Sequence, residues 1–159
     1  MIFLLTIAGL FASGQSFVSP LRVDENVAVL AKKLAYAAVS SKKKILLSGD
    51  IATNIPGLYQ KFFVFVCKGK RFSLYYQWQA GEPSLFNQEF LSLYVRKEGT
   101  DGPDDLRGYK DFHLNGTWDE CRLGTFSYSF SSPDEGNNFD AEIQEDYRQA
   151  LKEALSYFN

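Results

Sequence analysis

Apolar residues recur at helical spacing in two segments, one near each end of the chain. Across residues 23–39 they repeat every three or four positions, with Lys32 and Lys33 on the opposite face. The segment after Asn138 has a second apolar stripe, made of Ile143, Tyr147, Ala150, Leu151, Ala154, Leu155 and Phe158. The pattern predicts an N-terminal and a C-terminal helix, each with one buried face.

Between the helices, polar and apolar residues alternate with the period of two that is typical of strands. The alternation is strictest over residues 71–79, where Phe72, Leu74, Tyr76 and Trp78 share one face. Further strands are predicted at 44–52, 61–67, 89–97, 109–114 and 122–130. Residues 98–107 gather carboxylates around glycine and proline and predict an exposed loop.

One strand differs from the others because residues 62–66 are apolar on both faces. Such a strand is expected to be covered twice, by a helix on one face and by a second layer or a closed barrel interior on the other. The order of elements predicts an α+β fold, a curved antiparallel sheet of about six strands with an N-terminal and a C-terminal helix packed on it. A lipocalin-like β-barrel with flanking helices is the alternative.

The chain opens with an uncharged apolar run of about ten residues, followed by small and polar residues up to Ser16. Such a run is too short to span a membrane, which takes roughly 20 residues. We therefore expect a secretory signal peptide at residues 1–16 and a single α+β domain at 17–159, with no stable membrane insertion after the signal is removed. A buried N-terminal strand or helix is the alternative.

The same N-terminal segment also fits a second kind of targeting signal. Residues 15–20 resemble the junction of a bipartite presequence, in which a signal peptide is followed by Phe and a transit segment, as in algae with complex plastids. Asp24 and Glu25 are unusual for such a segment. The chain is thus expected to be secreted, or else to be a plastid-imported accessory protein of an alga.

Secretion would expose the chain to disulfide formation and glycosylation, which gives two cysteines and one asparagine a specific interpretation. In a secreted chain, Cys67 and Cys121 are expected to form a disulfide bond, and two buried thiols are the alternative. Asn115 begins an Asn-Gly-Thr glycosylation sequon, which predicts an exposed loop carrying a sugar. The Asn-Gly pair is also a hairpin-turn signal.

Charge argues against one class of partner. The chain has a net charge of −2 and a pI near 5.4, whereas nucleic-acid binding calls for clustered positive charge. The lysines at 42–44 read as a solvated helix end. We expect no nucleic-acid partner.

No catalytic pattern stands out. His113 is the only histidine, the spacing of a zinc site or a nucleophile motif is missing, and pairs of carboxylates are expected by chance among 19 acidic residues. The acidic loop at 101–105 lacks the spacing of a calcium loop. No metal and no cofactor are expected, and enzymatic activity is the less favoured reading.

Aromatic residues are the remaining candidates, since they make up 16% of the chain. A patch or cavity is predicted from Tyr75, Tyr76, Trp78, Tyr94 and Trp118, although aromatic residues at period two are more often core. The first hypothesis is a secreted non-enzymatic binding protein that holds a small apolar ligand or docks a protein partner through aromatic and loop residues. The second is a secreted hydrolase that uses carboxylates.

Overall fold

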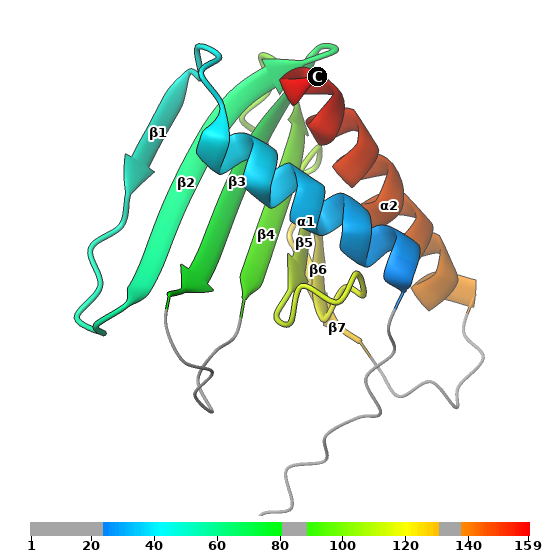
Figure 1. Cartoon of the computed structure of the whole chain (residues 1–159). Coiled ribbons are helices and arrows are strands. Elements are labelled where there is room, and N and C mark those ends of the chain that lie inside the picture. The colour runs from blue at the N-terminus through cyan, green and yellow to red at the C-terminus, as the bar shows by residue number, and fades with distance from the viewer. Residues whose placement is uncertain (1–23, 81–88, 131–137) are drawn as a thin grey trace, which may run out of the picture.

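The computed structural model describes residues 24–80, 89–130 and 138–159. The predicted signal peptide and the plastid junction lie outside these residues. The elements in chain order are α1 (Glu25–Ser40), β1 (Leu47–Asp50), β2 (Leu58–Cys67), β3 (Lys70–Gln79), β4 (Phe90–Lys97), β5 (Arg107–Asp111), β6 (Glu120–Leu123), β7 (Phe126–Ser129) and α2 (Asn138–Phe158) (Figure 1).

The strands form one antiparallel sheet in which each strand pairs with its neighbours in the chain, in the order β1 to β7. The sheet is open, because β1 and β7 form its two edges. The predicted α+β fold is therefore confirmed. The alternative of a closed lipocalin-like barrel is wrong.

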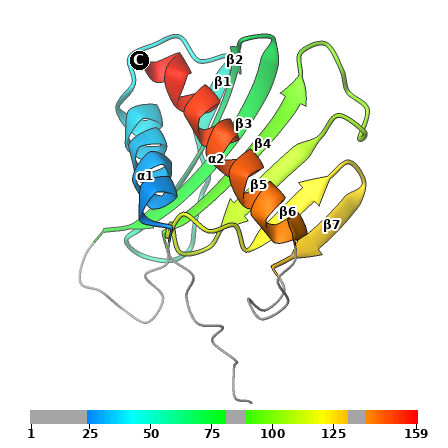
Figure 2. The same ribbon diagram turned by 90° about the vertical axis from the view of Figure 1, so that its right-hand side faces the viewer.

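Both helices lie on the same face of the sheet (Figure 2). They run side by side in the same direction. Near their N-termini the Gln144 amide donates to the Asp24 carboxylate at 3.4 Å, and near their C-termini the Tyr157 hydroxyl donates to the Lys44 carbonyl at 2.6 Å. The molecule thus has two layers, one of helices and one formed by the sheet.

Helix α1 begins where the sequence supplies a cap. The Asp24 carboxylate accepts a hydrogen bond from the Val27 amide at 3.2 Å, which satisfies one of the free N–H groups of the first turn. The buried side of α1 is made largely of small residues that let it pack closely, and it consists of Val27, Ala31, Leu34, Ala35 and Ala38.

The core lies between the helices and the sheet. The face predicted for residues 71–79 is confirmed, since Phe72, Leu74 and Tyr76 are buried there. Trp118 is fully buried, and its indole N–H donates to the Asp140 carbonyl at 3.4 Å. The largest fully buried side chains also include Tyr109, Tyr147, Phe65, Leu34, Leu91, Leu93, Leu114 and Leu151.

The sequence analysis was wrong about the last strand. The segment 122–130 is part of a hairpin, with β6 and β7 joined at Gly124, whose φ of +62° is the left-handed conformation that glycine adopts at low cost. The period-two pattern continues on both sides of this turn, so alternation alone could not detect it. The sheet therefore has seven strands.

The strand predicted at 109–114 ends earlier, at Asp111, because this carboxylate folds the chain into a loop. It accepts backbone N–H bonds from His113, Asn115 and Gly116 at 3.3, 3.0 and 2.8 Å, and the Tyr147 hydroxyl donates to it at 3.3 Å. Burial raises the pKa of Asp111 to about 6, although the three N–H donors act in the opposite direction. One buried side chain thus fixes the loop that meets both helices.

The two cysteines are free thiols, so the expected disulfide bond is not formed. Cys67 ends β2 and Cys121 lies on β6, with three strands between them. Four strand spacings amount to about 19 Å in a flat sheet, whereas a disulfide needs Cα atoms within about 7 Å. Burial raises the pKa of the Cys121 thiol to about 11.

Within the described residues, neither helix combines the length and the apolar character that crossing a membrane takes.

Candidate functional site

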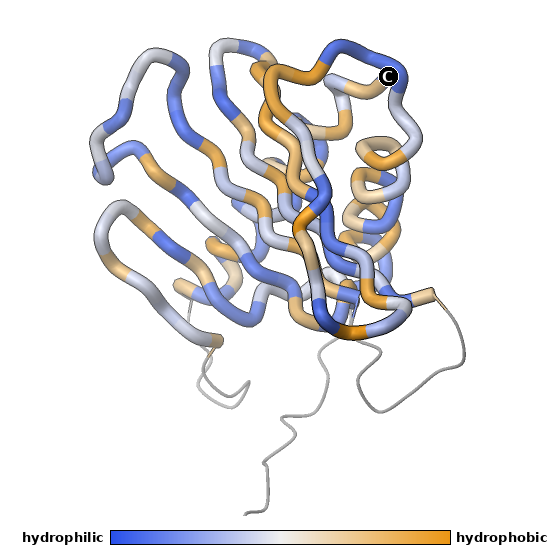
Figure 3. Tube along the Cα trace, turned by 90° about the vertical axis from the view of Figure 1, so that its left-hand side faces the viewer, coloured by the Kyte–Doolittle hydropathy of each residue, from blue (hydrophilic) through white to orange (hydrophobic). Residues whose placement is uncertain are grey.

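The two faces of the sheet are covered differently. Among the described residues, no element packs over the face opposite the helices, which we call the outer face (Figure 2). The second layer expected over residues 62–66 is not found there. Polar and apolar segments alternate along the strands (Figure 3), and the outer face carries both kinds. Most of its central residues are half-buried by their neighbours in the sheet, and Ser92 and Gly108 are buried.

A shallow hollow of about 350 Å³ lies on this face. Strand register explains its lining, because Leu47, Val64, Ser73 and Tyr94 are partners in one row across β1 to β4, and Arg71 and Arg96 are partners two positions further along. Leu106, just before β5, closes one side. We call this site the arginine hollow, and it consists of Leu47, Val64, Arg71, Ser73, Tyr94, Arg96 and Leu106.

Gly108 leaves room for an aromatic ring at the side of the hollow. Gly108 is the β5 partner of Tyr94, and a Cβ on Gly108 would lie 2.5 Å from Cε1 of the Tyr94 ring. The ring therefore occupies the space that a side chain at position 108 would take. This places an aromatic ring beside the two arginines.

The arginines share one carboxylate. Arg71 contacts the Asp101 carboxylate at 2.9 Å, and Arg96 donates to the Asp101 carbonyl at 3.1 Å while its guanidinium lies 3.7 Å from the carboxylate. Like charges directly opposite each other on paired strands repel, so an anion between them is stabilising. Asp101 comes from the turn after β4, and its side chain is 88% exposed.

The outer face is positive although the chain is negative overall. Among strand positions that register places on this face, the cations are Arg71, Arg96, Lys110 and Arg122, and the carboxylate is Glu120. Lys110 and Glu120 form an ion pair with each other. The other three strand cations, Arg71, Arg96 and Arg122, give the outer face a positive charge that favours an anion.

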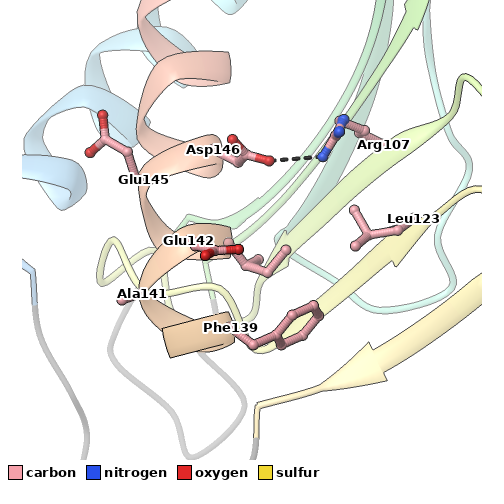
Figure 4. Close-up of a pocket in the computed structure, with 8 residues that line it drawn as sticks. Arg107, Leu123, Phe139, Ala141, Glu142, Glu145 and Asp146 are labelled. Carbon is pink, nitrogen blue, oxygen red and sulfur yellow. Dashed lines mark hydrogen bonds and ion pairs between the residues drawn. The ribbon is translucent and has the colours of Figure 1, made fainter. Parts of the chain in front are cut away.

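A larger groove, of about 710 Å³, lies on the helix side of the sheet, between the first turns of α2 and strands β5 and β6 (Figure 4). Its apolar part contains Phe139 and Leu123, and Arg107, the one cation among the described residues that line it, is paired with Asp146 at 2.8 Å. Other carboxylates on α2 line the groove. In the groove one cation thus faces one carboxylate, whereas in the arginine hollow two cations share a single carboxylate.

The five aromatic candidates do not lie together in the structure. Tyr94 lines the arginine hollow, and Tyr75 lies half-buried on the same outer face. Tyr76 and Trp118 are in the core, and Trp78 is half-buried on the helix side. Tyr75 and Tyr94 thus share the outer face with Arg71 and Arg96, and the sequence analysis did not name these two arginines as site residues.

Trp78 belongs to a row of stacked rings. It lies between Tyr59 and Tyr76, with ring centroids 5.4 and 5.1 Å away and interplanar angles of 18° and 14°. The Tyr76 hydroxyl donates to Glu89 at 3.2 Å, and burial raises its pKa. These contacts account for Tyr76 and Trp78 as packing residues.

Asn115 and His113 lie in the loop that Asp111 holds. The Asn115 side-chain oxygen accepts a hydrogen bond from the Thr117 amide at 2.9 Å, so the half-buried asparagine forms a turn of its own. His113 is exposed in a turn rather than in a strand. In the ranges 24–80, 89–130 and 138–159, no three His, Cys, Asp or Glu side chains are grouped so as to hold a metal ion.

The fold and the site define a class in physical terms, an open α+β domain with helices on one face of its sheet and a positively charged hollow on the other. Comparison of the chain with protein-family models, with curated proteins and with solved structures finds no match.

Proposed function

We propose that this protein is a non-enzymatic binding protein that holds a small, partly apolar ligand in the arginine hollow. The observation that carries the proposal is the hollow itself, since apolar side chains and two paired arginines meet on a sheet face that no described element covers. Small-molecule sites combine apolar walls with a few polar groups that fix orientation, in volumes of about 300 to 1,000 Å³.

The side chains of the hollow favour binding over chemistry. Leu47, Val64 and Leu106 offer apolar surface, and the guanidinium groups of the two arginines offer hydrogen-bond donors. Arginines orient and neutralise an anion but do not act as a general base. This supports a holding role.

The proposal is tested with three amphiphiles that share an eight-carbon chain: octanol, octanoate and octylammonium. Amide shifts in 15N–1H spectra should move at Val64 and Tyr94 with at least one of them. The dissociation constant should be on the order of 1 mM, as a ligand of about ten heavy atoms allows. No shift at the hollow with any of the three, or shifts confined to the groove of Figure 4, would refute the proposal.

Two neighbouring leucines give a matched control. Leu47 lines the hollow and Leu46 does not, while both are exposed. Leu47→Ser should weaken binding about threefold to tenfold, as loss of one apolar contact predicts. Leu46→Ser should leave binding unchanged.

We also propose that the protein is secreted after removal of residues 1–16. Helix α1 supports a cleavage site before Asp24, because the helix is capped by this residue and its buried side forms part of the core. Processing tens of residues later, as plastid import requires, would remove part of α1. Sequencing of the mature N-terminus tests this, and a start beyond residue 24 would contradict secretion.

A further inference from the structure

The charge of the outer face restricts which ligands fit the arginine hollow. Arg71 and Arg96 are direct partners across β3 and β4, so their positive charges are held close by the register of the sheet. Burying an apolar ligand beside them would strip water from two cations, which is unfavourable unless an anion accompanies it. A ligand that brings its own anion meets this condition.

Asp101 already occupies the position of such an anion. Its carboxylate lies 2.9 Å from Arg71 and 3.7 Å from Arg96, between two guanidinium groups that are both available for charge-assisted hydrogen bonds. Asp101 supplies one negative charge for two positive ones. The site therefore remains positive even when Asp101 is in place.

Asp101 is also easy to displace. Its side chain is 88% exposed, and it comes from a turn outside the sheet. An exposed ion pair of this kind contributes little to stability, since solvent screens it. The Arg96 side chain is only 21% exposed, so the cation is the better-held member of the pair.

The apolar part of the hollow adjoins this anion position. Leu47 and Val64 lie two register positions from Arg71 and Arg96, and Leu106 stands beside them. The Tyr94 ring lies on the same row, over Gly108. A short hydrocarbon chain attached to the anion would thus contact apolar side chains and an aromatic ring.

We propose that the ligand of the arginine hollow is a carboxylate carried on an apolar tail. The carboxylate takes the place of the Asp101 carboxylate between Arg71 and Arg96, and the tail lies against Leu47, Val64 and Leu106. This inference rests on the proposed function and adds the chemical class of the ligand. It also assigns Asp101 as an internal competitor for the site.

The three amphiphiles separate the two proposals. Octanoate should bind at least tenfold more tightly than octanol, and octylammonium should bind most weakly, because a like charge near two arginines is repelled. Equal binding of octanol and octanoate would overturn the carboxylate inference and leave the binding function standing. Failure of all three would overturn both.

Two arginines provide the matched variants. Arg96→Gln removes a cation of the hollow, and Arg122→Gln removes one from the same face outside it, where Nε of Arg122 donates to the Gly124 carbonyl at 3.1 Å. Arg96→Gln should weaken octanoate binding about tenfold, the size of one charge-assisted hydrogen bond. Octanol binding should stay the same. Equal losses from both variants would show a general field effect and overturn the site.

Asp101→Asn tests the competitor directly. Removing its charge should tighten octanoate binding about threefold, since a weak, solvent-screened ion pair no longer competes with the ligand. Asp101→Glu, which keeps the charge, should bind octanoate about as the unchanged protein does. Weaker binding by Asp101→Asn would overturn the assignment, because it would mean that Asp101 assists the ligand.

Discussion

The two faces of the sheet are made from alternate residues of the same strands, yet the two faces differ in how deeply their side chains are buried. Phe63 is 4% exposed beneath the helices, whereas Phe62, the residue before it, is half-buried on the outer face. Both are phenylalanines in the same strand. The difference shows that helix coverage, rather than the apolar character of the strand, decides which residues become core.

The largest expected effect concerns the contact between the 112–119 loop and α1. Gly116 has φ of +85°, and a Cβ there would lie 2.2 Å from the Ala28 amide nitrogen and 2.5 Å from the Asp24 carbonyl oxygen. Backbone atoms cannot move aside as a flexible side chain can. Gly116→Ala should therefore lower the free energy of unfolding by more than about 4 kcal/mol in urea denaturation.

Gly99 is the control for this change. Its φ is +79°, and a Cβ there would meet nothing within 4 Å. Gly99→Ala should cost only about 1 kcal/mol, the conformational term alone. Equal losses at both positions would contradict the tight seating of the loop against α1.

The next effect compares the two phenylalanines directly. Phe63→Ala should destabilise by about 3 to 4 kcal/mol, as expected for a fully buried ring. Phe62→Ala should cost about half as much, because its ring is partly in solvent and packs over Gly49. Similar losses in urea unfolding would mean that a further layer covers the outer face.

A pH effect is expected on the helix side, at Asp111. Its pKa is raised to about 6 in the folded state, against about 3.9 for an unfolded aspartate. The folded protein thus holds more protons between these values, so the free energy of unfolding should fall as pH rises from about 4 to about 6. The upper bound is on the order of 3 kcal/mol.

Asp111→Asn isolates this contribution, because the asparagine does not titrate. The difference in unfolding free energy between the two proteins should change across pH 4 to 6 and stay constant from pH 6.5 to 8. Parallel profiles throughout would exclude a raised pKa at Asp111.

On the outer face, a charge change should matter little for stability. Arg96→Gln removes an ion pair with Asp101 and also a like-charge repulsion with Arg71, and these two effects oppose each other. Its free energy of unfolding should differ from that of the unchanged protein by less than about 1 kcal/mol. A larger loss in urea unfolding would make the arginine pair a structural element.

The last prediction needs no substitution, because it compares how fast the two native thiols react. Cys67 is half-buried, while Cys121 is buried and its pKa is raised to about 11. At pH 8, iodoacetamide should alkylate Cys67 at least tenfold faster than Cys121, because the thiolate is the reactive form. Mass spectrometry without added reductant measures both sites, and a bridged pair, which would react at neither, would contradict the sheet order.

Much of the fold was predictable because period-two and helical patterns report burial directly. The faces of residues 71–79 and the apolar side of α1 followed from this. The turn at Gly124 and the 112–119 loop did not. One depends on a single left-handed residue, and the other on a buried carboxylate whose backbone donors become visible only when the chain is folded.

The candidate site was half predictable for a related reason. Alternation placed Tyr94 on the same face as Arg96, but the pairing of Arg71 with Arg96 depends on the register between β3 and β4. Gly81 and Pro83 predict a loop in the segment that joins these strands, but a loop of that length does not fix a register as a short hairpin turn does. Asp101 comes from a loop, and no periodicity predicts which side chain a loop residue will meet.

The chain-neighbour pairing of the strands has a consequence for synthesis on the ribosome. Each hairpin can close as soon as its second strand has emerged, because no strand waits for a distant partner. Helix α1 is made first, yet its cap region contacts Gly116 and Gln144, which are made much later. The N-terminal end of α1 therefore lacks these contacts until translation nears the end, and this is the interval in which a nascent chain most needs a chaperone.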